Sequence, residues 1–342
     1  SEVPRMKRLC TLGLLAVFTS STASAAGFEA KTMRDTLSDR EIERSLLIGK
    51  GWLEIGLGGD WKLATGAWGS DRQAVEWSET GTEFLYTTQR IDIRYGITRR
   101  GEFYWQAKTH YLQLTNDELS TDTTQFGIGD PRFGYKAELF RTMAPLTSVI
   151  GYAEYKAPAG NESPGNYVGG PTTFTSFITT TGTPDLELGI RAKKQVGPVA
   201  VEGGAGYVRR FSSAVQYAIE TSYNQFAGRI KPGDEVRLDG SVMLQLGPVA
   251  IHGGGQYVDR DEVKIGNTAA GWSPAANLKV QEGSDGWSLD AVAGSIISVS
   301  QGVDIVLSAQ VPLQGEDLMY FPIEDLHPTR GNTYSGTLEF RY

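Results

Sequence analysis

From residue 51 onward, apolar and polar residues alternate with a period of two. Residues 186–193 place apolar or small side chains at every second position and charged residues or glycine between them, and residues 236–246 and 303–311 repeat the pattern. Successive side chains of a strand point to opposite faces, so these runs predict strands with one apolar face. Twelve strands are predicted, over residues 51–63, 84–95, 102–113, 127–140, 146–157, 184–195, 199–211, 234–246, 249–262, 284–298, 303–314 and 332–342.

The connections between these strands alternate between long and short. Six are long, at about residues 64–83, 114–126, 158–183, 212–233, 263–283 and 315–331, and the five between them are short. A transmembrane barrel has this asymmetry, with short periplasmic turns and long extracellular loops. An even number of strands also places both ends of the barrel on the periplasmic side.

Residues 197–210 are repeated fifty positions later as residues 247–260, each copy beginning with Gly-Pro-Val-Ala. One period contains two strands, one short turn and one long loop. Repeated hairpins favour a meander barrel over a propeller, which would show more than two copies.

The N-terminus carries the one long apolar run. Basic residues at 7–8 precede an apolar stretch at 9–18, and Ala23-Ser24-Ala25 fits a cleavage site, so residues 1–25 are interpreted as a signal peptide with a short upstream extension. The single cysteine, Cys10, lies inside it. Residues 26–50 are a polar periplasmic segment, in which a capping-box pattern at 38–41 predicts a short helix over 39–47. This segment could act as a plug or tether in the lumen, or as a flexible lead-in.

Composition changes the picture in two ways. One apolar run is too few for a helical membrane bundle, which needs several runs of about 20 residues. Residues 1–25 hold three basic residues and one acid, so their removal changes the formal net charge from -8 to -10, which argues against nucleic acid as a partner.

Lipid cannot hydrogen-bond an exposed backbone, so β-structure in a bilayer must close on itself. We therefore expect an all-β fold, with residues 51–342 forming one antiparallel meander transmembrane β-barrel; a soluble sandwich is the alternative.

The alternating strands, the signal peptide and the C-terminal residues 338–342 resemble Gram-negative outer-membrane barrels. In that class the aromatic end of the last strand, here Phe340 and Tyr342, is the assembly signal for the insertion machinery. Within the class, residues 127–136, which begin Gly-Ile-Gly-Asp-Pro, and residues 183–189 resemble the family described as the MetA pathway of phenol degradation. The resemblance implies a porin-like or transporter-like barrel associated with uptake of small, often aromatic, compounds.

Signatures of enzymes and metal sites are poor. The three histidines, His110, His252 and His327, form no zinc motif, and no nucleophile elbow is present. Asp259, Asp261 and Glu262 could bind a divalent cation, but a solvated acidic rim is the simpler interpretation. We expect no catalysis, no cofactor and no metal.

Strand parity assigns a set of charged residues to the inner face. A charge facing lipid at the midplane costs about 2–4 kcal/mol, so these side chains must face water or each other. They line either a wet channel or a salt-bridged core that closes the lumen. The predicted lumen-lining residues are Arg90, Asp92, Arg94, Lys108, His110, Asp130, Arg132, Lys136, Glu187, Arg191, Lys193, Glu202, Arg237, Asp239, His252, Asp290, Asp304, Glu339 and Arg341.

The function expected from these patterns is an outer-membrane channel for passive diffusion of small solutes. Five basic residues of the set, Arg90, Arg94, Arg132, Arg191 and Lys193, suggest anionic solutes. The alternatives are a FadL-like transporter of hydrophobic compounds, with the N-terminal segment as its plug, and a non-conducting structural or adhesive barrel. The expected partners are outer-membrane lipid and lipopolysaccharide, the barrel-insertion machinery and a small solute.

Overall fold

The computed structural model describes residues 40–68, 72–76, 81–116, 121–143, 145–159, 182–218, 225–267, 278–280, 284–300, 302–316 and 329–342. The described residues belong to one compact unit. The signal peptide, the cleavage site and the capping-box serine lie outside them. Among the described residues, no helix has the length and hydropathy needed to cross a membrane.

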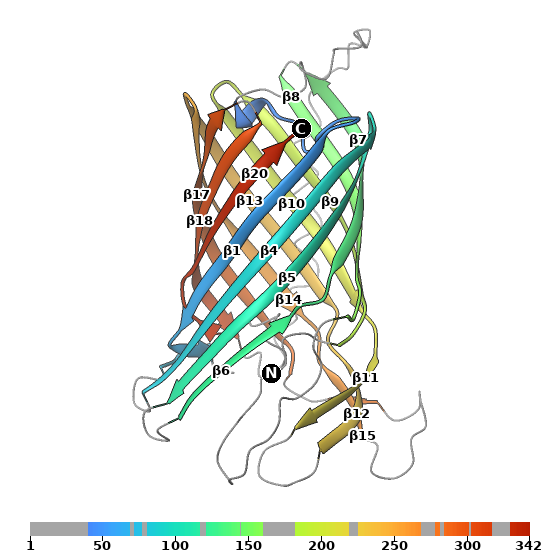
Figure 1. The fold of residues 1–342 in the computed structure, drawn as a ribbon, viewed down its shortest axis with the longest axis vertical. Coiled ribbons are helices and arrows are strands. Elements are labelled where there is room, and N and C mark those ends of the chain that lie inside the picture. The colour runs from blue at the N-terminus through green and yellow to red at the C-terminus, as the bar shows by residue number, and fades with distance from the viewer. Residues whose placement is uncertain are drawn as a thin grey trace, which may run out of the picture. The chain divides into compact units, whose positions relative to one another are not determined.

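Twelve antiparallel strands close into a barrel (Figure 1), as the alternation predicts. They lie in sequence order around the ring, so the fold is a meander, and β1 pairs with β20 to close it. Their bounds are β1 Leu53–Ala64, β4 Thr82–Thr98, β5 Gly101–Asn116, β7 Arg132–Met143, β8 Leu146–Lys156, β9 Asp185–Val196, β10 Val199–Arg210, β13 Glu235–Leu246, β14 Val249–Arg260, β17 Gly286–Ser300, β18 Val303–Glu316 and β20 Thr333–Arg341.

The two faces of the barrel wall differ in chemistry. Large apolar side chains such as Leu57, Ile91, Leu188 and Val242 are 44–53% exposed on the outer face. The residues between them on the same strands are mostly charged, polar or glycine, and many are buried. An apolar outside with a polar inside is the arrangement that a bilayer requires of a barrel.

The short turns carry the repeated Gly-Pro pairs. Gly197 between β9 and β10 has φ +62°, and Gly247 between β13 and β14 has φ +64°. Only glycine adopts this conformation without a steric penalty, and two-residue hairpins require it. The repeat seen in the sequence therefore encodes two equivalent turns at one end of the barrel.

The strand predicted over 127–140 is interrupted. A break at Gly129, Asp130 and Pro131 separates β6, Thr121–Ile128, from β7. Proline cannot donate a backbone hydrogen bond, and the buried Asp130 instead accepts one from the backbone N–H of Ala159 at 3.1 Å. The long loop predicted over 114–126 is also largely wrong. There β5 and β6 pair as a hairpin, with Thr109 opposite Ile128 at one end and Asn116 opposite Thr121 at the other.

Four of the other long connections contribute short strands rather than irregular loops alone. A three-stranded sheet contains β2 Gly66–Trp68, β3 Ala74–Glu76 and β19 Thr329–Arg330. A four-stranded sheet contains β11 Ser213–Ala218, β12 Gln225–Lys231, β15 Lys264–Asn267 and β16 Lys279–Val280. Most of the predicted loop 158–183 lies outside the described residues.

Residues 40–50, called here the inner segment, precede β1 and lie inside the barrel. Glu41–Glu43 form one 3-10 turn, labelled η2, and Arg44 is already extended. The helix predicted over 39–47 is therefore reduced to a single turn. Ile42 is fully buried and packs on Ala200, Met243 and Ala250 of three neighbouring strands.

Candidate functional site

The inner segment contacts the barrel wall around much of its circumference. Its hydrogen bonds reach seven of the twelve strands of the barrel, through Arg94, Glu102, Ser148, Lys193, Gln245, Ser298 and Asp304. Several of these wall residues lie within four positions of a short turn, so the inner segment occupies the short-turn end of the lumen.

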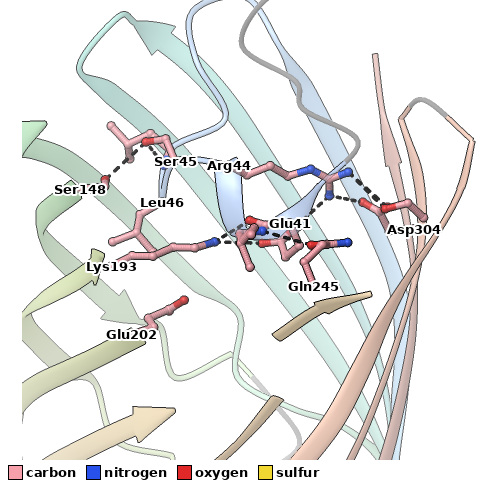
Figure 2. A network of polar contacts seen from close by, with 12 residues as sticks. Glu41, Arg44, Ser45, Leu46, Ser148, Lys193, Glu202, Gln245 and Asp304 are labelled. Carbon is pink, nitrogen blue, oxygen red and sulfur yellow. Dashed lines mark hydrogen bonds and ion pairs between the residues drawn. The ribbon is translucent and has the colours of Figure 1, made fainter. Parts of the chain in front are cut away.

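Charged contacts hold the turn of the inner segment on two sides (Figure 2). The Lys193 ammonium donates to the backbone oxygen of Glu41 at 2.8 Å and lies 3.4 Å from its carboxylate. Arg44 donates to the carboxylate of Asp304, with Nη1 at 2.5 Å from Oδ2 and Nη2 at 3.4 Å from Oδ1. Glu41 and Arg44 also pair with each other at 2.9 Å. The side chains of Lys193, Arg44 and Asp304 are at most 8% exposed, so these contacts are shielded from water.

The extended part of the inner segment is held through its backbone. The Ile48 N–H donates to Glu102 at 2.9 Å, and the Leu46 carbonyl accepts from Arg94 at 3.0 Å. The hydroxyls of Ser45 and Ser148 are 3.4 Å apart. Backbone groups that would be unsatisfied inside a barrel thus find partners in the wall.

The same end of the wall contains a charge network around the seam between β20 and β1. Arg341 on β20 donates to three carboxylates, those of Glu54, Asp304 and Glu339. Arg94 bonds Glu54 at 2.7 Å and Glu102 at 2.9 Å, and Lys136 lies 3.1 Å from Glu102. Carboxylates therefore outnumber the wall cations beside β18, β20 and β1.

Farther from the short-turn end of the lumen, charged pairs retain exposed surface. Arg191 pairs with Asp239 above Gly204, and the two side chains are 39% and 41% exposed. Arg90 pairs with Asp92 at 3.2 Å and Asp60 at 3.5 Å, and all three are 24–28% exposed. Because these side chains point inward, space that water can enter remains beside them.

Two inward-facing tyrosines lie over glycines of neighbouring strands. A side chain on Gly134 would collide with the Tyr104 ring, and one on Gly189 with the Tyr152 ring. Tyr104 donates to Glu154 at 2.8 Å, and Tyr152 donates to Glu187 at 2.7 Å. The glycines in the predicted strands make room for rings whose hydroxyls bond to inward-facing carboxylates.

At the opposite end of the barrel, charged side chains are again deeply buried. The fully buried Glu235 accepts from Arg210, Arg260 and Arg237 at 2.5–2.6 Å. Lys156 pairs with Asp185 at 2.7 Å. Arg237 belongs to the predicted set, and the other residues share its inward parity, so the same pattern could have identified them.

The structure brings together most of the predicted lumen-lining residues through the contacts above. Lys108 and His110 face the bend at Gly129, His252 lies against Gly294, and Asp290 accepts from Gln310 at 2.9 Å. The His110 Nδ1 lies 2.7 Å from the Tyr86 hydroxyl. That these side chains line a solute pathway stays a prediction, as does the assembly role of Phe340 and Tyr342.

Sequence analysis gave a plug or tether in the lumen as one interpretation of residues 26–50 but missed Glu41 and Arg44, because no local pattern marks the contact residues of a polar stretch before the first strand. Within the described part of the chain, no group of three or more His, Cys, Asp or Glu side chains is placed to hold a metal ion.

Several solved structures are similar in fold to this chain. The COG4313 outer membrane channel from Pseudomonas putida F1 is similar over 86% of this chain and 96% of that chain, with a TM-score of 0.63 at 10% identity. The translocator domain of the autotransporter NalP from Neisseria meningitidis matches over 86% and 88%, with a TM-score of 0.44 at 11% identity. The toluene transporter TbuX from Ralstonia pickettii matches over 86% and 90%, with a TM-score of 0.43 at 9% identity.

No protein-family model and no curated protein matches the sequence, so the resemblance to the MetA-pathway family stays a prediction. The closed twelve-stranded ring and the likeness to the Pseudomonas channel show that the chain has the fold of bacterial outer-membrane β-barrels.

Proposed function

We propose that this protein is an outer-membrane channel for small solutes, gated by its inner segment at the short-turn end. The observation that carries the proposal is the position of residues 40–50, which bond to seven wall strands and cross the lumen. A solute that enters from the loop end meets this segment before it leaves the barrel. Passage requires the segment to move, and it involves no chemical step.

The ion pairs make such movement feasible. An ionised group left buried without a partner costs several kcal/mol, which would normally hold the segment in place. When the inner segment moves away, Arg44 remains paired with Glu41 on that segment, and Asp304 remains paired with Arg341 in the wall. Glu102 likewise remains paired with Arg94 and Lys136. Release of the inner segment from the wall, called undocking here, therefore leaves most of these charges paired.

The lumen supports polar solutes better than hydrophobic ones. The partly exposed inward side chains are charged pairs such as Arg191 with Asp239 and Arg90 with Asp92. Arg94 and Arg132 also have carboxylate partners, so the basic residues expected to favour anions are paired rather than in surplus. The resemblance of residues 127–136 and 183–189 to the MetA-pathway family makes aromatic compounds a further class to test.

A disulfide between the inner segment and the wall tests the gate. The Ser45 and Ser148 hydroxyls are 3.4 Å apart, so Ser45→Cys with Ser148→Cys places two sulfurs within bonding reach. Cys10 is the only natural cysteine and lies in the predicted signal peptide. In planar bilayers we expect the oxidised variant to stay closed and the reduced variant to show current steps.

A wall disulfide is the control. Ser308 on β18 and Ser335 on β20 are register partners on the inner face, so Ser308→Cys with Ser335→Cys adds a crosslink that leaves the inner segment free. Its current should not depend on redox state. Equal currents from the oxidised and reduced Ser45–Ser148 variant would refute gating by the inner segment, and the absence of current in every state would favour the non-conducting barrel.

A further inference from the structure

Four alternating charges cross the lumen at the gate. They are Lys193 on β9, Glu41 and Arg44 on the inner segment, and Asp304 on β18, joined by contacts of 3.4, 2.9 and 2.5 Å. Figure 2 shows Lys193 reaching Glu41 from one side and Asp304 receiving Arg44 on the other. The turn of the inner segment thus presents an anion to one wall and a cation to the facing wall.

The two wall residues stand on nearly opposite sides of the barrel. Around the ring, β9 and β18 are five strands apart in one direction and seven in the other. When the inner segment leaves, a cation remains on one wall and a carboxylate on the wall across from it.

Each wall keeps its sign after undocking. Among the described residues, the Lys193 ammonium contacts Glu41 alone. The carboxylate opposite it in the strand register, Glu202, pairs instead with Arg191 at 3.5 Å. On the other wall, Arg341 is shared between Asp304, Glu339 and Glu54, and Glu54 also pairs with Arg94, so three carboxylates face two guanidinium groups.

We propose that Lys193 and Asp304 form a binding site for zwitterionic solutes at the gate. The solute carboxylate accepts from the Lys193 ammonium in place of Glu41, and its ammonium or guanidinium donates to Asp304 in place of Arg44. A solute with one charge replaces only one of the two contacts and leaves the inner segment held by the other. The site therefore couples arrival of a zwitterion to release of the segment, and it rests on the proposed gating function.

Three five-carbon probes separate the two contacts. The zwitterion 5-aminopentanoate carries both charges, pentanoate only the carboxylate and pentylammonium only the ammonium. In liposome swelling with the full protein, we expect 5-aminopentanoate to enter on the order of tenfold faster than either of the others, the effect of one added charge-assisted hydrogen bond.

Variants assign the contacts to residues. Lys193→Gln should abolish the advantage of 5-aminopentanoate over pentylammonium, and Asp304→Asn should abolish its advantage over pentanoate. Both changes loosen the inner segment and raise all rates, so the measured quantity is the ratio between probes. The paired variant Glu41→Lys with Lys193→Glu restores a reversed ion pair and should still abolish the preference for the carboxylate. Arg209→Gln alters an exposed cation on β10 that is not among the predicted lumen-lining residues, and it should leave the ratios unchanged.

The outcomes are distinguishable from those of the gate itself. Equal entry of the three probes, with redox control of the Ser45–Ser148 variant intact, would overturn the zwitterion site and leave the gate standing. Ratios unchanged in Lys193→Gln or Asp304→Asn would also overturn it. Loss of redox control would remove the gate and this site together.

Discussion

Single buried charges in this barrel are stabilised by several partners at once. Glu235 is fully buried and accepts from three arginines, and Arg341 donates to three carboxylates. Removing an ion from water costs several kcal/mol unless its hydrogen-bonding capacity is met. Such sharing explains how a lumen rich in charge remains compatible with a folded wall.

Asp234, in the connection before β13, offers a test at the residue scale. It accepts from the Arg210 N–H and the Lys231 ammonium at 2.9 Å, and from the Tyr207 hydroxyl at 3.0 Å. Burial acts to raise the pKa of its carboxyl, but these hydrogen bonds outweigh it and hold that pKa below its ordinary value. A lowered folded-state pKa contributes stability above the unfolded pKa, and this contribution is lost as the pH falls through the folded pKa.

We therefore expect Asp234→Asn to lower the unfolding free energy by about 1 kcal/mol at neutral pH, because the ion pair with Lys231 is lost. The difference from the natural protein should be smaller at about pH 2 than at neutral pH, because the stability tied to the lowered pKa of Asp234 is lost as the pH falls through that pKa. Unfolding midpoints in detergent at the two pH values measure it. A deficit of the same size at both would show that charge is not the cause.

At the scale of elements, turns and breaks are set by a few backbone requirements. The Gly-Pro turns need a positive φ at Gly197 and Gly247. The break between β6 and β7 follows from Pro131, which lacks a backbone N–H, beside the buried Asp130.

Substitution of the turn glycine should reveal this requirement. Nothing lies within 4 Å of a side chain added at Gly247, so Gly247→Ala costs only the left-handed backbone, about 1–2 kcal/mol. Gly253 in β14 lacks a positive φ, and its nearest neighbour would be 3.9 Å away, so Gly253→Ala is the matched control with little effect. Comparison of unfolding midpoints checks the pair, and equal midpoints would contradict the argument.

At the scale of the whole molecule, the wall separates two solvents. The outward Val242 is 53% exposed near the middle of β13, and Gln256 on β14 faces inward between Asp239 and Asp290 in the register. An arginine on the lipid face must leave water, whereas one between two carboxylates finds partners.

We expect Val242→Arg to reduce folding stability in lipid bilayers by about 2–4 kcal/mol, and Gln256→Arg to have a much smaller effect. Urea titrations in liposomes, followed by tryptophan fluorescence, measure both variants. A greater loss for Gln256→Arg would mean that the two faces have been assigned the wrong way round.

Strand number, alternation of the faces and the two Gly-Pro turns followed from the sequence, and inward parity also placed Arg191 and Lys193 on one face. These features depend on residues one to three positions apart, where the geometry of a strand leaves little choice. The broken strand at Asp130 and Pro131 was missed because the flanking alternation continues through it.

The partners of the inner segment were decided by tertiary structure alone. Glu41 meets Lys193 across 152 positions of sequence, and Arg44 meets Asp304 across 260. Only closure of the ring brings the facing walls within reach of one short segment, and desolvation inside that ring then selects the partners that leave each charge paired. A pattern of period two carries no information about which inner side chains meet across the lumen.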